Sequence, residues 1–177
     1  MIFDELKTAV VQALNNDAYF SDPDAPVTVL EENRMDFYSE FEAALGKSGV
    51  GAMVSISQIR DGEVGTEIVV TVLIQFHEIP LFNRGDGGTK KPASSLAMKA
   101  LAILGNRSLR LARIWSPLIF RNLALTDVDE SRAMVTWSLE YEVRTLLHEI
   151  VTVMTTENNK VLVTETGKAL ILSPTEP

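Results

Sequence analysis

The sequence predicts an α+β fold, with a mainly antiparallel sheet of about four long strands packed by two or three helices. One observation is that apolar residues occupy every second position between Arg132 and Arg144. Side chains of a strand point alternately to opposite faces, so this pattern predicts a long strand with one buried face. That face consists of Ala133, Val135, Trp137, Leu139, Tyr141 and Val143.

The other observation is that three segments carry apolar residues at spacings of three and four, as one face of a helix does. The first helix is expected over residues 2–14 and ends at Asn15-Asn16-Asp17. The second begins at Asn33, an N-cap residue, and closes at Gly46. The third covers Ala93 to Leu104, has a narrow alanine-rich stripe and ends at Gly105.

Composition limits the class of protein. With 177 residues the chain fits one ordinary domain, and we expect an α+β core over residues 1–146 and a β extension with a loose tail over 147–177. The absence of cysteine excludes disulfides, zinc-thiolate sites and thiol nucleophiles. A net charge of −8 disfavours binding to a phosphate backbone. The chain opens with no charged leader and apolar run, so we expect a soluble, unexported protein.

The remaining strands follow from shorter patterns. Residues Ser21–Pro26 suit a surface loop before a short strand over Val27–Leu30. A strand from Val50 then turns at Asp61-Gly62. Its partner faces inward with Ile68, Val70, Val72, Ile74 and Phe76.

Two apolar residues, Val69 and Leu73, interrupt the polar side of that partner strand. We expect this side to be partly covered by a helix of the same chain or by a neighbouring subunit.

The region after the third helix is also β-rich. Leu109 to Trp115 fits neither period, and a strand is expected over Leu118–Asp127 before a turn at Asp129-Glu130. Three short β-rich pieces at the C-terminus are expected to form added hairpin strands. They are Ile150–Thr155, Lys160–Glu165 and Lys168–Leu172, followed by a tail, Ser173–Pro177.

The glycine-rich stretch Asn83–Pro92 lacks the ending of a P-loop and the glycine spacing of a dinucleotide site. A flexible connection is therefore the favoured interpretation, although a loop of this kind can become ordered on a partner. Its Lys90-Lys91 pair could bind an anion, but a solubilising surface is the more ordinary role.

No pattern of residues forms a recognisable catalytic group. His77 and His148 lie far apart and have no metal-ligand spacing, so structural roles are favoured. Glu140 and Glu142 share a strand face with Arg132 and Arg144, which indicates a charged ladder more than an acid–base pair. Two further features also have ordinary explanations. They are Glu31-Glu32 with Asp36, which suit a helix N-terminus, and Trp115, which suits a core or interface anchor.

The order of these elements resembles the tail terminator proteins of tailed bacteriophages, including the minor tail protein U type. The matching features are the opening helix at Ile2–Leu6, the helix Ala93–Leu104, and Trp115-Ser116-Pro117-Leu118 leading to the strand Val135–Tyr141. The resemblance is one of layout and covers roughly residues 1–146, whereas the strands from Ile150 onward lie outside it.

The resemblance implies a structural protein, without cofactor or enzymatic activity, that forms a ring on the end of the tail tube, commonly a hexamer. Such a ring stops tube polymerisation, offers a joining surface to a head-completion or neck protein, and lets DNA pass through its lumen without specific binding. It also implies a virion component made in the host bacterial cytoplasm, with no membrane association.

For this role we expect the loop residues Asn83, Arg84, Asp86, Lys90 and Lys91 to contact a partner, and Val69 with Leu73 to lie in a subunit interface. Two alternatives stay open. One is a small-molecule or anion-binding α+β module, or an enzyme, with a site near Arg84, Lys90 and Lys91. The other is a different neck or baseplate component.

Overall fold

In the computed structural model, which describes residues 2–32, 37–63, 65–111, 114 and 116–146, five strands form one sheet in the order β1-β2-β3-β5-β4. Four strands are long and antiparallel to their neighbours, as predicted, and a short β1 pairs in parallel with β2. The strands are β1 (Thr28–Glu31), β2 (Val50–Asp61), β3 (Glu67–Glu78), β4 (Ile119–Asp129) and β5 (Met134–Leu146). The predicted C-terminal strands fall outside the described residues.

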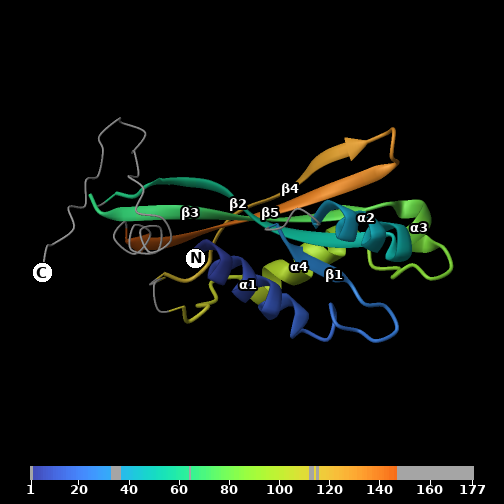
Figure 1. The fold of residues 1–177 in the computed structure, drawn as a ribbon, viewed down its shortest axis with the longest axis horizontal. Coiled ribbons are helices and arrows are strands. Elements are labelled where there is room, and N and C mark those ends of the chain that lie inside the picture. The colour runs from blue at the N-terminus through green and yellow to red at the C-terminus, as the bar shows by residue number, and fades with distance from the viewer. Residues whose placement is uncertain (1, 33–36, 64, 112–113, 115, 147–177) are drawn as a thin grey trace, which may run out of the picture.

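Helices cover both faces of this sheet, but unequally. The helices among the described residues are α1 (Ile2–Asn15), α2 (Phe37–Ser48), α3 (Pro80–Arg84) and α4 (Ala93–Leu104). Figure 1 shows α1 and α4 together below the strands, while the β4–β5 hairpin extends away from them. Phe41 and Leu45 of α2 pack instead on Met53, which belongs to the opposite face of the sheet. The β1–α2–β2 connection therefore places α2 on the second face.

The main core lies between the sheet and the α1–α4 layer. Alternation along β3 puts Val72, Ile74 and Phe76 there with no exposed surface, and Leu139 and Tyr141 of β5 lie beside them. On α4, Leu96, Ala97 and Ala100 are also fully buried, and this alanine-rich stripe allows the helix to approach the sheet closely. The patterns predicted for these three elements are confirmed.

Several local predictions are corrected. Helix α2 continues past Gly46 to Ser48, and Gly49 is the residue with a left-handed φ of 74°. A Cβ at Gly49 would lie 2.0 Å from the backbone nitrogen of Asn83, so close backbone approach explains this glycine. Ala133 belongs to the turn and not to the buried face of β5, because that strand begins at Met134. The predicted N-cap Asn33 lies outside the described residues.

Two β-bulges change the phase of β4. The pairing with β5 shifts between Phe120 and Asn122 and again between Leu125 and Asp127. Each bulge inserts one residue, so apolar residues spaced by three, two and three positions still point to the same face. These residues are Phe120, Leu123, Leu125 and Val128, opposite Tyr141, Leu139, Trp137 and Val135 of β5. The bulges explain why β4 lacks simple alternation in sequence.

Candidate interaction surfaces

The glycine-rich segment is anchored at its start by Asn83. The Asn83 side chain is 1% exposed; its Nδ2 donates to Glu78 Oε1 at 2.8 Å and to the carbonyl of Lys91 at 3.1 Å. The hydroxyl of Thr89 donates to Asn83 Oδ1 at 2.8 Å. The second Glu78 oxygen accepts the backbone N–H of Ala93 at the start of α4. This buried network joins β3, the segment and α4.

Lys91 anchors the other end of the segment. Its Nζ donates to the carbonyls of Tyr19 at 2.7 Å and Ala25 at 2.8 Å, and it pairs with Asp22 at 3.1 Å. The ammonium also lies 5.0 Å from the centre of the Tyr19 ring. A cation with this many partners in its own chain holds the loop after α1 against the segment before α4. The segment is thus fixed at both ends, which the flexible-connection interpretation did not anticipate.

These contacts divide the residues predicted to meet a partner. Asn83 and Lys91 are buried and engaged inside the chain, whereas Arg84, Asp86 and Lys90 are exposed. The partner-contact prediction therefore rests on the three exposed residues. The alternative anion site keeps only Arg84 and Lys90 as available cations.

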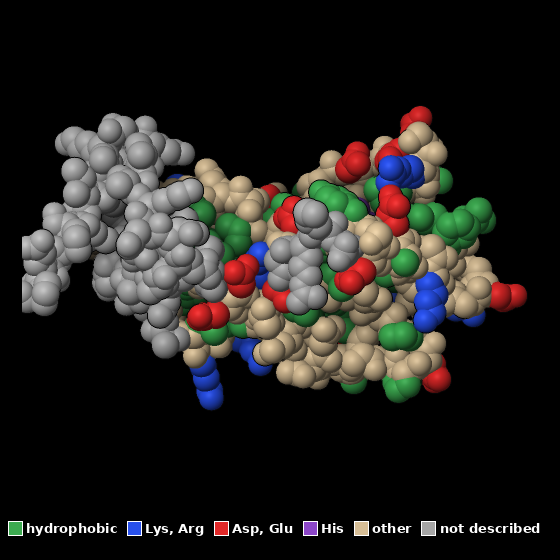
Figure 2. Space-filling view, in the orientation of Figure 1, with side chains coloured by type: hydrophobic (Ala, Val, Ile, Leu, Met, Phe, Trp, Pro, Cys, Tyr) green, Lys and Arg blue, Asp and Glu red, His purple; other side chains and the backbone are tan. Residues whose placement is uncertain are grey.

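Sequence reasoning missed the short helix α3, which begins with Pro80 at its first turn. Its Leu81 is 77% exposed and Phe82 is 50% exposed. Figure 2 shows hydrophobic side chains gathered at the end of the molecule where α3 lies. Such a cluster is typical of a contact surface.

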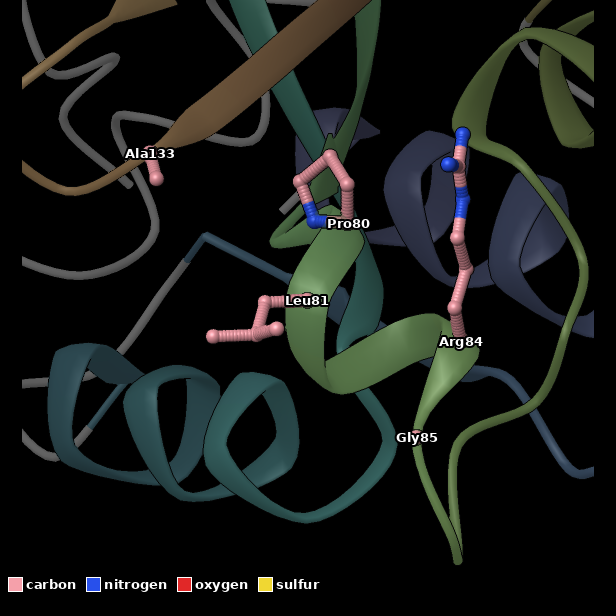
Figure 3. Close-up of a pocket in the computed structure, with 5 residues that line it drawn as sticks. All are labelled: Pro80, Leu81, Arg84, Gly85 and Ala133. Carbon is pink, nitrogen blue, oxygen red and sulfur yellow. The ribbon is translucent and has the colours of Figure 1, made fainter.

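An open hollow of about 550 Å³ lies between α3 and the β4–β5 turn. Leu81 projects from α3 toward the side where Ala133 lies, while Arg84 extends from the end of α3 on the other side of the helix (Figure 3). The proline at the start of α3 is the one sequence signal that could have revealed this helix. The hollow is mainly apolar, which suits a hydrophobic side chain better than a charged ligand.

The second face of the sheet is covered in part by side chains of the strands themselves. Val69 is 3% exposed and pairs directly with Arg60 on β2 and Arg144 on β5. Long arginine side chains can cover apolar neighbours with their stems while keeping their charge at the surface. Leu73 is half-buried. The role of Val69 and Leu73 in a subunit interface stays a prediction.

The predicted charged ladder exists on this face with different partners. Glu142 Oε1 accepts from Arg60 at 2.8 Å, and Oε2 accepts from Arg121 Nε at 2.7 Å. Burial raises the pKa of Glu142, but hydrogen bonds and charge from the two arginines outweigh burial and leave the pKa below its ordinary value. Arg144 pairs with Glu67. Arg132 lies outside the strand, in the β4–β5 turn, and pairs with Glu42 of α2 and with Asp129.

His77 is a packed residue of the same face. Its Nδ1 lies 3.0 Å from the Thr136 hydroxyl, and its ring meets Phe41 of α2 edge-on. Burial lowers the pKa of His77, although the charge of Asp127 opposes this shift. No group of three or more potential metal ligands occurs among the described residues. His148, Trp115 and Asp36 lie outside them.

Edge strand β4 carries the most exposed apolar face of the sheet. Phe120, Leu125 and Val128 are 41%, 49% and 55% exposed, although they point to the same side as the core residues of β5. Within the part of the chain that the structure describes, α1 packs on β1 and β2, α4 packs on β3 and β5, and β4 is left largely open. An uncovered apolar edge strand is a site for association.

A second hollow, of about 600 Å³, lies between α1 and the segment after α4. Its polar lining includes Gln12, Asn16, Arg107 and Arg110. Neither arginine forms an ion pair with any residue in the described ranges. This surface is therefore positive in an otherwise acidic chain.

None of the helices in the described part is long and apolar enough to cross a membrane. No protein-family model matches this sequence, and no curated protein matches it. Solved structures do share the fold. One is a chain from a structure titled "Virion of native gene transfer agent (GTA) particle", with a TM-score of 0.51 and 16% sequence identity over 80% of this chain and 94% of that chain.

Proposed function

We propose that this protein is a structural component of a phage-like particle. The observation that carries the proposal is the shared fold with the virion chain, which includes most of both chains. The helices and strands of the layout that resembles tail terminators belong to the described region, although Trp115 of that layout lies outside it. Two separate apolar surfaces, on α3 and on β4, are consistent with a protein that contacts several neighbours.

More specifically, the protein forms a ring on the end of the tail tube, ends tube growth and offers a joining surface to the head-completion or neck protein. A closed ring repeats one head-to-tail contact, so every subunit needs two different complementary patches. The exposed apolar flank of β4 is one candidate for such a patch. The net charge of −8 favours a lumen through which DNA passes without binding. In this role the protein has no catalytic activity.

Tube assembly tests this function directly. Tail tube protein is polymerised with and without this protein, and tube lengths are measured by electron microscopy. We expect added protein to shorten the length distribution and to place a ring of density on tube ends. Tubes that grow to the same lengths with excess protein, and that carry no end density, would contradict the proposal.

A charge reversal tests the loop. Arg84→Glu with Lys90→Glu changes the two exposed cations and leaves the Asn83 and Lys91 anchors in place. We expect this variant to fold and to lose tube capping or head joining. Lys47→Glu, an exposed change on α2, is the matched control and is expected to retain both. If the loop variant performs as well as the control, the loop is not the partner contact.

A further inference from the structure

The β4–β5 hairpin combines an apolar flank with an acidic turn. Phe120, Leu125 and Val128 form the exposed flank on the helix side of the sheet. The tip of the hairpin carries Asp127 and Asp129 at the end of β4 and Glu130 in the turn, against one arginine, so its net charge is negative. Asp127 is opposite Thr136 and points to the second face of the sheet. Figure 2 shows acidic side chains, with a basic one among them, where the hairpin tip lies.

The acidic groups at the tip of the hairpin are not equally available. The Asp129 carboxylate is occupied by the backbone N–H groups of Ser131 and Arg132 and by the Ser131 hydroxyl, which shape the turn. Asp127 and Glu130 are exposed and form no ion pair with a described residue, although the charge of Asp127 also acts on His77. These two carboxylates can therefore accept cations from another molecule.

The hollow beside α1 has the opposite charge. Arg107 and Arg110 are both exposed there, and the segment that carries them has a defined backbone. Asn106 N–H donates to the Leu118 carbonyl at 3.1 Å, and Leu118 N–H donates to the Arg107 carbonyl at 2.9 Å. These two bonds tie the segment to the residue just before β4. The backbone at Arg107 is thus held in place, which favours a specific contact over a diffuse positive surface.

The two surfaces lie apart on the molecule. In Figure 1 the β4–β5 turn lies at one end of the long axis, and the segment after α4 lies toward the other end, on the helical side. Because the two complementary surfaces lie at opposite ends, they cannot contact each other within one subunit. Repetition of the same contact between copies gives a head-to-tail assembly.

We infer that the β4–β5 hairpin of one subunit docks on the helical layer of the next copy of this chain. Asp127 and Glu130 meet Arg107 and Arg110 at the hollow, and the flank of β4 packs on the neighbouring helix surface, where Met98 of α4 is 58% exposed. Apolar contact supplies the affinity, while opposite charges select the partner surface and its orientation. This inference rests on the proposed ring and identifies the residues that build it.

Charge swapping tests the contact. One variant carries Asp127→Lys with Glu130→Lys, a second carries Arg107→Glu with Arg110→Glu, and a third carries all four changes. Mass is measured by light scattering during size-exclusion chromatography over a range of protein concentrations, at low and at high salt. Thermal unfolding of each variant establishes that it is folded. The matched control is Glu40→Lys with Glu63→Lys, which reverses two exposed acidic residues elsewhere.

We expect each two-residue reversal to raise the protein concentration needed for assembly at least tenfold, because it places like charges face to face at the contact. The four-residue variant restores assembly to within a few-fold of the unchanged protein, and the control assembles normally. Salt weakens assembly of the unchanged protein, since part of the attraction is electrostatic.

Other results would overturn the inference in distinct ways. Rings that persist in either two-residue variant, or that the four-residue variant fails to restore, reject this contact and leave the ring itself in place. A two-fold dimer through β4 alone would be sensitive to the hairpin changes and indifferent to those at Arg107 and Arg110. An unchanged protein that stays monomeric at every concentration and on tube ends rejects both the contact and the proposed function.

Discussion

Strands β3 and β4 both pair with β5, but only β3 is covered by a helix on the side of the main core. Phe76 of β3 has no exposed surface, because α4 lies over this strand. Phe120 of β4, on the same side of the sheet, is 41% exposed. Both residues are phenylalanines, so the difference in their exposure shows that the helical layer is narrower than the sheet. The uncovered strand is the part of the fold that is available to another molecule.

The largest expected effect contrasts these two phenylalanines. Phe76→Ala removes a fully buried ring and should lower the free energy of unfolding by about 3–5 kcal/mol. Phe120→Ala, at a partly exposed position, should cost about 1 kcal/mol in the isolated subunit. Urea denaturation monitored by circular dichroism measures both. Equal losses would show that β4 is covered as well as β3 is.

The next effect concerns the second face, where Glu142 links β2, β5 and β4 through Arg60 and Arg121. Both arginines are nearly half exposed, so solvent screens the pairs and Glu142→Gln should cost about 1 kcal/mol near neutral pH. The lowered pKa of Glu142 means that its contribution is complete above the ordinary value of 4.5 and is lost as pH falls through the folded-state pKa. Denaturation from pH 7 to pH 3 should therefore show the two proteins converging at acid pH. If the difference in the free energy of unfolding stays constant with pH, the ionised Glu142 carboxylate is not its cause.

A smaller effect strengthens the helix that covers the second face. Gly46 lies inside α2, and a Cβ there meets nothing within 4 Å. Gly46→Ala should raise the free energy of unfolding by about 0.5–1 kcal/mol, since alanine loses less backbone entropy on forming a helix. Thermal unfolding should show a modest rise in Tm. A fall in Tm would mean that position 46 needs a conformation that the helix does not supply.

The smallest effect is expected from His77, which packs under α2. Burial lowers its pKa from 6.5, so the unfolded chain takes up a proton at a higher pH than the folded protein does. Stability attributable to this residue is therefore present above pH 6.5 and is lost as pH falls toward the folded-state pKa. In the His77→Gln variant, the free energy of unfolding should fall less between pH 7 and pH 5 than it does in the unchanged protein. An unchanged slope in denaturation curves would assign the acid sensitivity to other groups.

Sequence reasoning succeeded where one local period decides the structure. Strand β5 and helix α4 were predicted from their apolar spacing, and the structure buries Leu139 and Ala97 as that spacing required. It failed where the period changes locally. The bulges of β4 displace Arg121 and Thr126, and no alternation in sequence marks them. The anchors at Asn83 and Lys91 were missed for another reason, because their partners Glu78 and Tyr19 are not recognisable as partners from spacing.

By itself, the sequence determined the long strands, the helical faces that point inward and the absence of thiol chemistry, because each depends on residue type or on neighbours a few positions apart. The tertiary structure decided that β5 lies between β3 and β4, that α2 packs on the second face, and that the helical layer leaves β4 uncovered. These features arise from contacts between segments far apart in the chain. They depend on how much of the sheet the helices can cover, and no local sequence pattern encodes that extent.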